Sequence, residues 1–319
     1  MQRYFLRRVL LSIPTIFGIT VLIFLAMRVL PGDPLAAISS EGQGMYVLTP
    51  DQLEAARHSL GLDKPLYVQY LEWMGDVAAG NLGQSFWTSE NISELILRRA
   101  PITAEIAVLA MAIAWLIGVP VGLFSATHRN SWIDFFTRGT LTVLLAVPSF
   151  WIGLIFILVG VTFFTWRPPL TITYLWDQPL LNLEMVLGPG IALGIGLAAS
   201  TARLTRSTVL DVLNDDFVRT ARAKGLRERA VLGTHVLRNA ILPVVTATGL
   251  SFSGLLGGAV ATETAFGVPG LGNLLVQGLN TRDWMLVQNM VLIYGVIVVV
   301  VNLAVDLSYG WIDPRIRFH

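Results

Sequence analysis

Apolar residues are concentrated in six long blocks of this chain, with polar segments between them. Each block approaches or exceeds the ~20 residues that a helix needs to cross a bilayer, and none contains Lys, Arg, Asp or Glu. The blocks are Val9–Met27, Ile106–Thr127, Gly139–Trp166, Met185–Ala202, Ala240–Thr262 and Trp284–Val305. This pattern predicts an all-α polytopic membrane protein with six transmembrane helices. The third block is longer than one span requires, so we expect it to tilt or to end early.

The first block predicts a retained helix, so residues 1–30 form an amino-terminal cytoplasmic end and the first transmembrane helix. It is too long for the apolar core of a signal peptide, and no clear small-x-small cleavage site follows it. A cleaved signal peptide is the alternative.

Residues 31–100 predict a small helical segment outside the membrane. The residues Thr49–Gln52 predict the start of a helix, and Gly61 would end that helix. A second helix follows Asp63-Lys64-Pro65 and ends at Gly80. Its apolar face consists of Tyr70, Trp73, Met74 and Val77. The segment either covers the outer ends of the spans or contacts an external partner.

The polar segment at about residues 211–240 concentrates the chain's basic residues and predicts two helices joined by a turn. The residues that favour the first helix start are Asn214, Asp215 and Asp216. Gly225 suits the position just past the end of that helix, and a second helix begins near Arg227. The small Ala221 and Ala223 suggest a helix that fits into a groove on a partner. Binding of anionic lipid is the alternative explanation of the positive charge.

Composition agrees with a membrane protein and argues against an enzyme. Hydrophobic residues make up 54% of the chain and charged residues 13%, against roughly 25% charged in soluble domains. The chain has no cysteine, and neither of its two lysines, Lys64 and Lys224, ends a phosphate-binding loop. The four histidines lie far apart in the sequence. We therefore predict no catalytic, cofactor or metal site.

The distribution of Lys and Arg predicts the orientation. With both termini in the cytoplasm, the inner segments carry 15 Lys and Arg residues and the outer segments carry 7, out of 22 in all. This asymmetry follows the positive-inside rule for a multi-pass protein of the cell inner membrane. The basic segment then faces the cytoplasm, and its lack of interleaved aromatic residues argues against nucleic-acid binding.

The basic segment also resembles a known motif. Arg219–Gly225 followed by Arg238–Pro243 is similar to the EAA loop of ABC importer permeases in the dipeptide/oligopeptide/nickel family. Further similar segments are Leu30–Pro34, Leu60–Pro65, Gly80–Ser85, Glu263–Gly272, Asp306–Gly310 and Asp313–Arg317. The extended amino-terminal half resembles the B-type subunit, the first of the two permeases. The chain departs from the motif at one position, where Arg219 or Thr220 replaces the glutamate after which the loop is named. We therefore assign no ionic contact of that glutamate to this chain.

The resemblance implies a type I ABC importer permease fold with a core permease domain at residues 101–319. The residues implied to couple the permease to an ATPase are Asp216, Arg219, Thr220, Ala221, Arg222, Ala223, Lys224, Gly225 and Leu226. The residues implied to form an outer gate are Glu263, Phe266, Pro269, Gly270 and Gly272. A plain turn is the alternative for this second group.

The implied partners are a second homologous permease in a heterodimer, two cytoplasmic ATPase subunits that use ATP and Mg, an extracytoplasmic solute-binding protein, and membrane lipid. The implied substrate is a peptide, with nickel complexes or sugars as alternatives within the family. A different class, a carrier driven by an ion gradient, usually needs ionisable groups at mid-membrane. Gln288, Asn289 and Asn302 either line a path or form hydrogen bonds between helices. The Gly-x-x-x-Gly pairs that begin at Gly118, Gly190 and Gly254 favour close helix packing, with hinges as the alternative.

Overall fold

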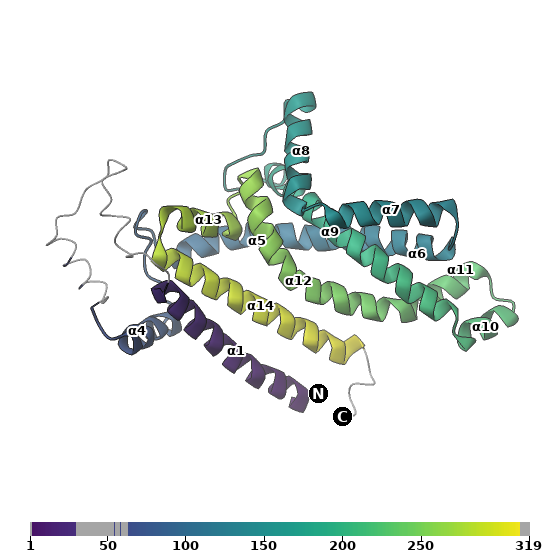
Figure 1. Ribbon diagram of the computed structural model, residues 1–319, viewed down its shortest axis with the longest axis horizontal. Coiled ribbons are helices and arrows are strands. Elements are labelled where there is room, and N and C mark those ends of the chain that lie inside the picture. Colours follow the sequence, from purple (N-terminus) through teal and green to yellow (C-terminus); the bar gives the residue numbers. More distant parts are fainter. Residues whose placement is uncertain (1, 30–53, 55–57, 59–62, 313–319) are drawn as a thin grey trace. The chain divides into compact units, whose positions relative to one another are not determined.

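The computed structural model describes residues 2–29, 54, 58 and 63–312, which are almost entirely helical (Figure 1). The helix expected from Thr49 to Gly61 lies outside these residues, apart from two isolated positions. The chain divides into two compact units. The first consists of Met1–Arg8, Pro101–Asn273 and Val300–His319, and the second of Val9–Ala100 and Leu274–Val299. The second unit brings together segments that are far apart in the sequence.

Helices that lie mainly in the first unit follow one another with short connections, except for residues 165–178 between α8 and α9. They are α5 (Ile92–Ile113), α6 (Val119–Thr127), α7 (Trp132–Ala146), α8 (Ser149–Phe164), α9 (Pro179–Leu213), α10 (Asp216–Ala223), α11 (Glu228–Ala230) and α12 (Arg238–Phe266). π-Helical turns at Ala114–Gly118 and Val231–Leu237 join α5 to α6 and α11 to α12. The helices that lie mainly in the second unit are α1 (Gln2–Val29), α4 (Leu66–Ala78), α13 (Leu271–Thr281) and α14 (Trp284–Ile312).

Within the described residues, five helical stretches are long and apolar enough to cross a membrane. They are Arg8–Arg28, Ile92–Thr127, Pro179–Leu213, Glu228–Phe266 and Trp284–Val305. The expectation of one helix over Gly139–Trp166 is wrong, because α7 and α8 meet at an angle of 95° (Figure 1). Pro148 disfavours helical backbone at the preceding residue, and Val147 is indeed extended, with φ −90° and ψ 124°. Taken as one broken span, the pair supplies the sixth crossing.

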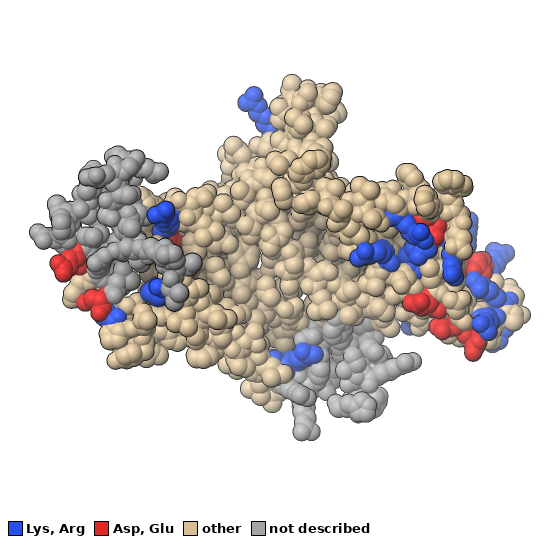
Figure 2. All heavy atoms as spheres, viewed as in Figure 1, with Lys and Arg blue, Asp and Glu red and all other residues tan. Residues whose placement is uncertain are grey.

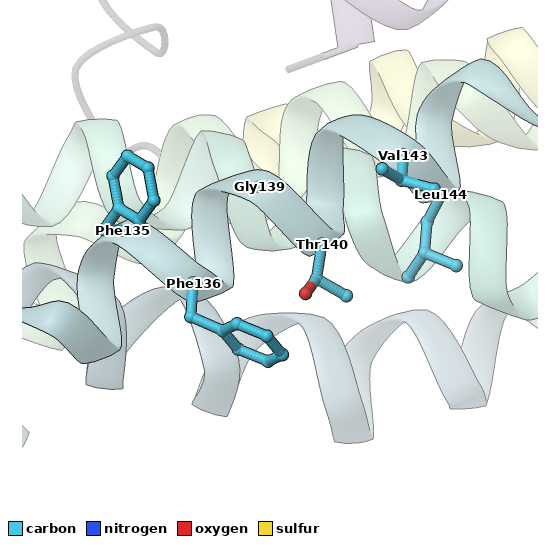
Figure 3. Close-up of a pocket in the computed structure, with 6 residues that line it drawn as sticks. All are labelled: Phe135, Phe136, Gly139, Thr140, Val143 and Leu144. Carbon is cyan, nitrogen blue, oxygen red and sulfur yellow. The ribbon is translucent and has the colours of Figure 1, made fainter.

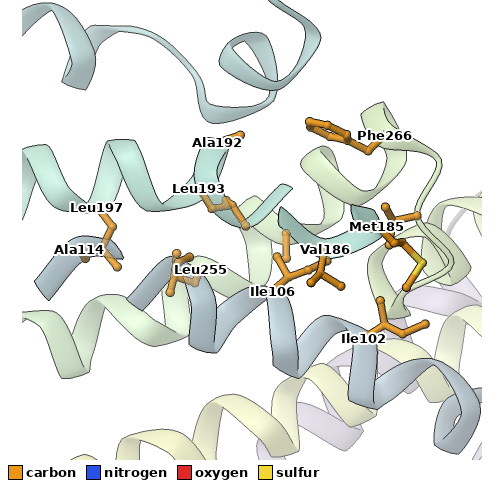
Figure 4. Close-up of a cluster of buried hydrophobic side chains, with 13 residues drawn as sticks. Ile102, Ile106, Ala114, Met185, Val186, Ala192, Leu193, Leu197, Leu255 and Phe266 are labelled. Atoms are coloured by element: carbon orange, nitrogen blue, oxygen red, sulfur yellow. The ribbon is translucent and has the colours of Figure 1, made fainter. Parts of the chain in front are cut away.

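The core of the first unit is built from small and branched apolar side chains of α5, α9 and α12. Figure 4 shows Ile102 and Ile106 of α5 facing Met185 and Val186 of α9, with Leu255 of α12 nearby. All five side chains are buried. This packing holds the three long helices as one body.

Two glycines allow α6 and the π-turn before it to lie directly against α9. A Cβ atom at Gly118 would lie 2.7 Å from the carbonyl oxygen of Ala198, and one at Gly122 would overlap the carbonyl oxygen of Ala202. The close-packing interpretation is thus confirmed for this pair. In the pair that begins at Gly254, an added Cβ at Gly258 would lie 3.0 Å from Leu193 Cδ2, whereas one at Gly254 would meet no described atom within 4 Å, so the interpretation holds for Gly258 but not for Gly254.

Gly122→Ala is expected to lower the free energy of unfolding by about 1–3 kcal/mol, the usual cost of overpacking. The matched control is Gly254→Ala, which adds the same methyl group in open space and should be neutral or stabilising by up to about 1 kcal/mol through helix propensity. Thermal unfolding in detergent measures both. Equal midpoints for the two variants would contradict the close approach.

In the second unit, α4 packs through the face expected from sequence. Trp73 is buried with Phe24 of α1 and Val287 of α14, and Tyr70, Met74 and Val77 pack around them. The indole N–H of Trp73 donates to Asn289 Oδ1 at 3.3 Å. Asn289 also donates to the Leu82 carbonyl oxygen at 2.9 Å. This contact confirms the hydrogen-bonding interpretation for Asn289.

Asn302 likewise forms a hydrogen bond between helices, in the first unit. The hydroxyl of Ser253 on α12 donates to Asn302 Oδ1 on α14 at 2.8 Å.

Candidate functional site

The hairpin α10–Gly225–α11 has the helix–turn–helix form that the capping residues predict. Gly225 lies in the left-handed region with φ 75°. Its N–H donates to the Arg222 carbonyl oxygen at 2.9 Å, and the N–H of Leu226 donates to that of Ala221 at 3.4 Å. These two bonds form a Schellman motif, which needs glycine or a residue tolerant of positive φ at its centre. The turn is therefore fixed by the backbone of Gly225.

One face of α10 is buried against the rest of the first unit. Val218 is fully buried and Ala221 is 6% exposed, in a cluster with Ala126 of α6, Val209 of α9 and Ala240 of α12. The interpretation of Ala221 as a residue that fits a partner's groove is therefore corrected. Its small side chain lets α10 pack on its own chain, and Ala223 lies on the exposed side.

Ion pairs orient the exposed face of the hairpin. Arg222 donates to both carboxylate oxygens of Glu228, at 2.7 and 3.2 Å, and thereby joins α10 to α11. This hydrogen bond is the main reason why the pKa of Arg222 is raised above its ordinary value. Both side chains are about half exposed, so the pair adds little stability. The ion pair instead constrains the angle between α10 and α11. Arg219 pairs with Asp216 within α10 at 3.3 Å.

The remaining surface of the hairpin offers positive charge and two apolar side chains. Lys224, Arg227 and Arg229 are exposed and have no ion-pair partner within the described part of the chain. Figure 2 shows Lys and Arg side chains gathered where α10 and α11 lie. Phe217 and Leu226 are 42% and 44% exposed. Phe217 was not among the coupling residues expected from sequence. Its position next to Val218 places it off the buried face of α10.

A buried ion pair ties together the helices on which the hairpin rests. Arg206 of α9 donates to both oxygens of Asp134 at 2.7 and 2.8 Å. The hydroxyl of Ser125 on α6 donates to Asp134 at 2.7 Å, and the N–H of Asn130 does so at 3.2 Å. Sequence inspection missed this network. Its only local signal is the helix start at Ser131, whose hydroxyl accepts from the N–H of Asp134.

Asp134→Ala is expected to lower the free energy of unfolding by about 3–5 kcal/mol, because Arg206 would lose its partner in a nearly buried position. The double variant Asp134→Leu with Arg206→Met should recover much of the loss, since it removes both charges. Thermal unfolding of the two proteins and of wild type measures the difference. A single variant as stable as wild type would contradict a structural role for this pair.

The corner between α12 and α13 is held by a buried carboxylate. Glu263 is fully buried and accepts from the hydroxyl of Thr103 at 2.7 Å and from the N–H of Gly272 at 2.7 Å. The N–H of Asn273 donates to the same carboxylate at 3.2 Å. The N–H of Leu271 donates to Thr103 Oγ1 at 2.8 Å. Glu263 thus satisfies the first N–H groups of α13, where the helix dipole favours negative charge.

The proposed outer-gate residues all belong to this corner. A Cβ at Gly270 or Gly272 would collide with the Glu263 carboxylate, so both positions need glycine for space. Phe266 is 2% exposed and packs closely over Gly153 and Gly188. Pro269 is half-buried. The segment is more than a plain turn, and α13, which follows it, was not expected from sequence.

Surfaces elsewhere on the first unit are strongly apolar. Figure 3 shows a cavity of about 370 Å³ along α7, lined by Phe135, Phe136, Gly139, Thr140, Val143 and Leu144. Its only side-chain oxygen belongs to Thr140. Such a surface suits lipid chains or a helix and has little to offer a polar solute.

Comparison with known proteins gives the family. Residues 118–318 match the family described as "Binding-protein-dependent transport system inner membrane component". Residues 1–107 match its amino-terminal companion, "Binding-prot-dependent transport system membrane comp, N-term".

Curated relatives match over almost their full length. The chain is 41% identical over 340 residues to the di/tripeptide transport system permease protein DppB of Pseudomonas aeruginosa, with 99% of each protein covered. It is 36% identical over 338 residues to the dipeptide transport system permease protein DppB of Alkalihalophilus pseudofirmus, with 100% of each covered.

Solved structures agree on the fold. An inward-facing structure of the MetNI methionine ABC transporter matches with a TM-score of 0.56 at 16% identity, over 69% of this chain and 96% of that chain. An amino acid ABC transporter crystallised with histidines matches with a TM-score of 0.50 at 20% identity, over 68% and 93%. The expected type I permease fold is confirmed. This multi-pass inner-membrane protein therefore belongs to the permease family of binding-protein-dependent ABC importers.

Proposed function

We propose that this permease carries di- or oligopeptides across the inner membrane, as the names of its relatives suggest. It pairs with a homologous second permease, receives solute from an extracytoplasmic binding protein, and is driven by two ATPase subunits that use ATP and Mg. The chain itself binds no cofactor. Nickel complexes and sugars are the alternative cargoes, and no contact among the described residues favours either.

The coupling mechanism is supported by one observation: the hairpin has a buried inner face and an exposed outer face. Its inner face, with Val218 and Ala221, packs on α6, α9 and α12. Its outer face offers Phe217, Lys224 and Arg227 to a partner. A force applied to the outer face would reach α6, α9 and α12, because the inner face is packed against all three. The hairpin is therefore the lever that an ATPase subunit moves in our mechanism.

The proposed orientation places both termini and the hairpin in the cytoplasm. The excess of Lys and Arg in those segments supports it. The Glu263 corner then lies on the outer side. Because the corner is cross-linked by hydrogen bonds, we propose that any outer gate moves it as one piece.

The contacts of three carboxylates, two buried and one half-buried, argue against a carrier driven by an ion gradient. Asp134 pairs with Arg206, Glu263 accepts from Thr103, and Glu105 accepts from Asn182 at 2.7 Å. Each carboxylate has a structural partner, whereas a coupling site must release its ion in every cycle.

The test uses the absence of cysteine in the chain. Ala223→Cys is introduced on the exposed side of α10 and combined with single cysteines on the ATPase subunit in proteoliposomes. We expect a disulfide to form and peptide uptake to require ATP. A cysteine at Leu158, an exposed apolar position on α8, should not cross-link. Uptake that follows an imposed ion gradient without ATP would refute the importer mechanism.

A further inference from the structure

A polar groove lies between α9 and α12, away from the hairpin and the corner. It has a volume of about 400 Å³. Five of its eight lining residues carry hydroxyl groups: Ser200, Thr201, Ser207, Thr248 and Ser251. The only charged group in its lining is Arg203. The groove lies at the inner end of the predicted span Met185–Ala202 and beside the inner half of the predicted span Ala240–Thr262, where such a concentration of polar groups needs an explanation.

Arg203 differs from the arginine one turn further along α9. Arg206 is paired with Asp134, whereas Arg203 is exposed and has no hydrogen bond or ion pair within the described part of the chain. A guanidinium at the edge of a span can reach the lipid headgroups by extending its side chain. Here it borders a groove lined by hydroxyls, so an anionic group that enters the groove finds a charged donor.

The hydroxyls supply the complementary acceptors. Ser200 donates to the Leu197 carbonyl oxygen at 2.9 Å. Thr248 and Ser251 donate to carbonyl oxygens one turn earlier on α12, each at 2.8 Å. Because the hydroxyl hydrogens of these three residues are used within their own helices, their oxygen lone pairs remain as acceptors towards the groove.

Thr201 adds an unsatisfied group. It borders the groove, is 1% exposed, and its hydroxyl has no hydrogen-bond partner among the residues that the structure describes. A buried polar atom without a partner is costly and rare. A ligand or water in the groove would satisfy it.

We propose that this groove is a peptide-binding subsite on the transport path, in which Arg203 pairs with the carboxylate of the passing peptide and the hydroxyl oxygens accept from its N–H groups. A peptide has both features, whereas the headgroup of an anionic lipid such as phosphatidylglycerol has the anion without N–H groups. The inference rests on the proposed function, since it concerns the same substrate class.

The first test measures protection. Ser251→Cys is made in the cysteine-free chain and assembled into the complete importer in liposomes, and its reaction with a water-soluble thiol reagent is followed. We expect labelling to slow by at least about threefold when binding protein, dipeptide and ATP are present, since a ligand in a pocket covers most of its walls. The control is Leu250→Cys, the exposed neighbour on α12 that does not line the groove, whose labelling should not change. Unchanged labelling of Ser251→Cys would overturn the proposal.

The second test addresses charge. Uptake of a dipeptide and of its carboxyl-terminal amide is compared for wild type, Arg203→Gln and Arg203→Lys. Because all variants use the same binding protein, its own preference cancels in the ratio. Arg203→Gln should lower free-acid uptake about tenfold relative to amide uptake, and Arg203→Lys should restore most of it. Equal loss for both peptides would indicate a structural role and overturn the proposal.

A third arm repeats the protection assay in liposomes without anionic lipid. Protection by dipeptide should persist. If the groove is covered only when anionic lipid is present, it is a lipid headgroup site and the proposal fails. Failure of wild type to take up any peptide would refute the proposed function itself, whereas normal uptake without protection refutes the groove alone.

Discussion

Gly225→Val is expected to reduce ATP-driven uptake about tenfold, because a side chain in the left-handed region costs about 1–2 kcal/mol and a β-branched one more. Valine would favour another backbone conformation at position 225. The bonds to the Arg222 and Ala221 carbonyl oxygens would then be lost, and α11 would leave its place beside α10. Uptake and ATP hydrolysis are measured together in the complete importer, and we expect hydrolysis to persist while uptake falls.

Gly80→Val is a closely matched control. Gly80 has φ 78° and Gly225 has φ 75°, and an added Cβ meets no atom within 4 Å at either position. Gly80 also ends its helix, α4, with the N–H of Asn81 donating to the Asp76 carbonyl oxygen at 2.9 Å. The two variants should therefore carry similar strain, and only the hairpin variant should separate hydrolysis from uptake. The same loss of coupling in both would remove the special role of the hairpin.

The features that sequence predicted correctly depend on local chemistry. The turn at Gly225 follows from the acidic start of α10 and from a glycine at its end. The packing face of α4 follows from helical spacing of Tyr70, Trp73 and Val77. Each signal lies within a few residues, so the conformation can be inferred before the tertiary contacts are known.

The features that sequence missed depend on contacts over long distances. Arg206 and Asp134 are separated by 72 residues, and nothing near either residue identifies the other. Hydropathy alone could not divide Gly139–Trp166 into two helices, because both arms are apolar. The size of the bend at Pro148 depends on how α7 and α8 pack on α9.

The sequence also could not determine whether a small helical residue contacts a partner protein or its own chain. An alanine on a helix is equally compatible with a partner's groove and with the chain's own core. Ala221 is assigned to the core only because Val209 and Ala240 lie against it. The coupling assignment therefore moves towards the exposed residues of the hairpin and gains Phe217.

Glu263→Ala is expected to lower the free energy of unfolding by at least about 3 kcal/mol, since each buried donor left without a partner costs about 1–3 kcal/mol. The donors concerned are the Thr103 hydroxyl and the N–H groups of Gly272 and Asn273. Loss of the charge also removes a favourable interaction with the amino-terminal end of α13. Thermal unfolding in detergent measures the stability, and uptake by the complete importer should fall with it.

Two further variants serve as controls. Glu263→Gln keeps the size of the side chain but removes its charge, and Glu184→Ala removes a glutamate at an exposed position. Glu263→Gln keeps one acceptor oxygen but turns an amide group towards backbone N–H donors, so its stability should lie between those of wild type and Glu263→Ala. Glu184→Ala removes an exposed glutamate that accepts only one described hydrogen bond, from Trp166 at 2.7 Å, and should cost less than about 1 kcal/mol. If Glu263→Ala were no less stable than Glu184→Ala, the corner would not depend on its carboxylate. The proposal that an outer gate moves this corner through the Glu263 network would then be refuted. The corner would depend instead on the bond from the Leu271 N–H to Thr103 Oγ1, which joins α5 to the start of α13 without Glu263.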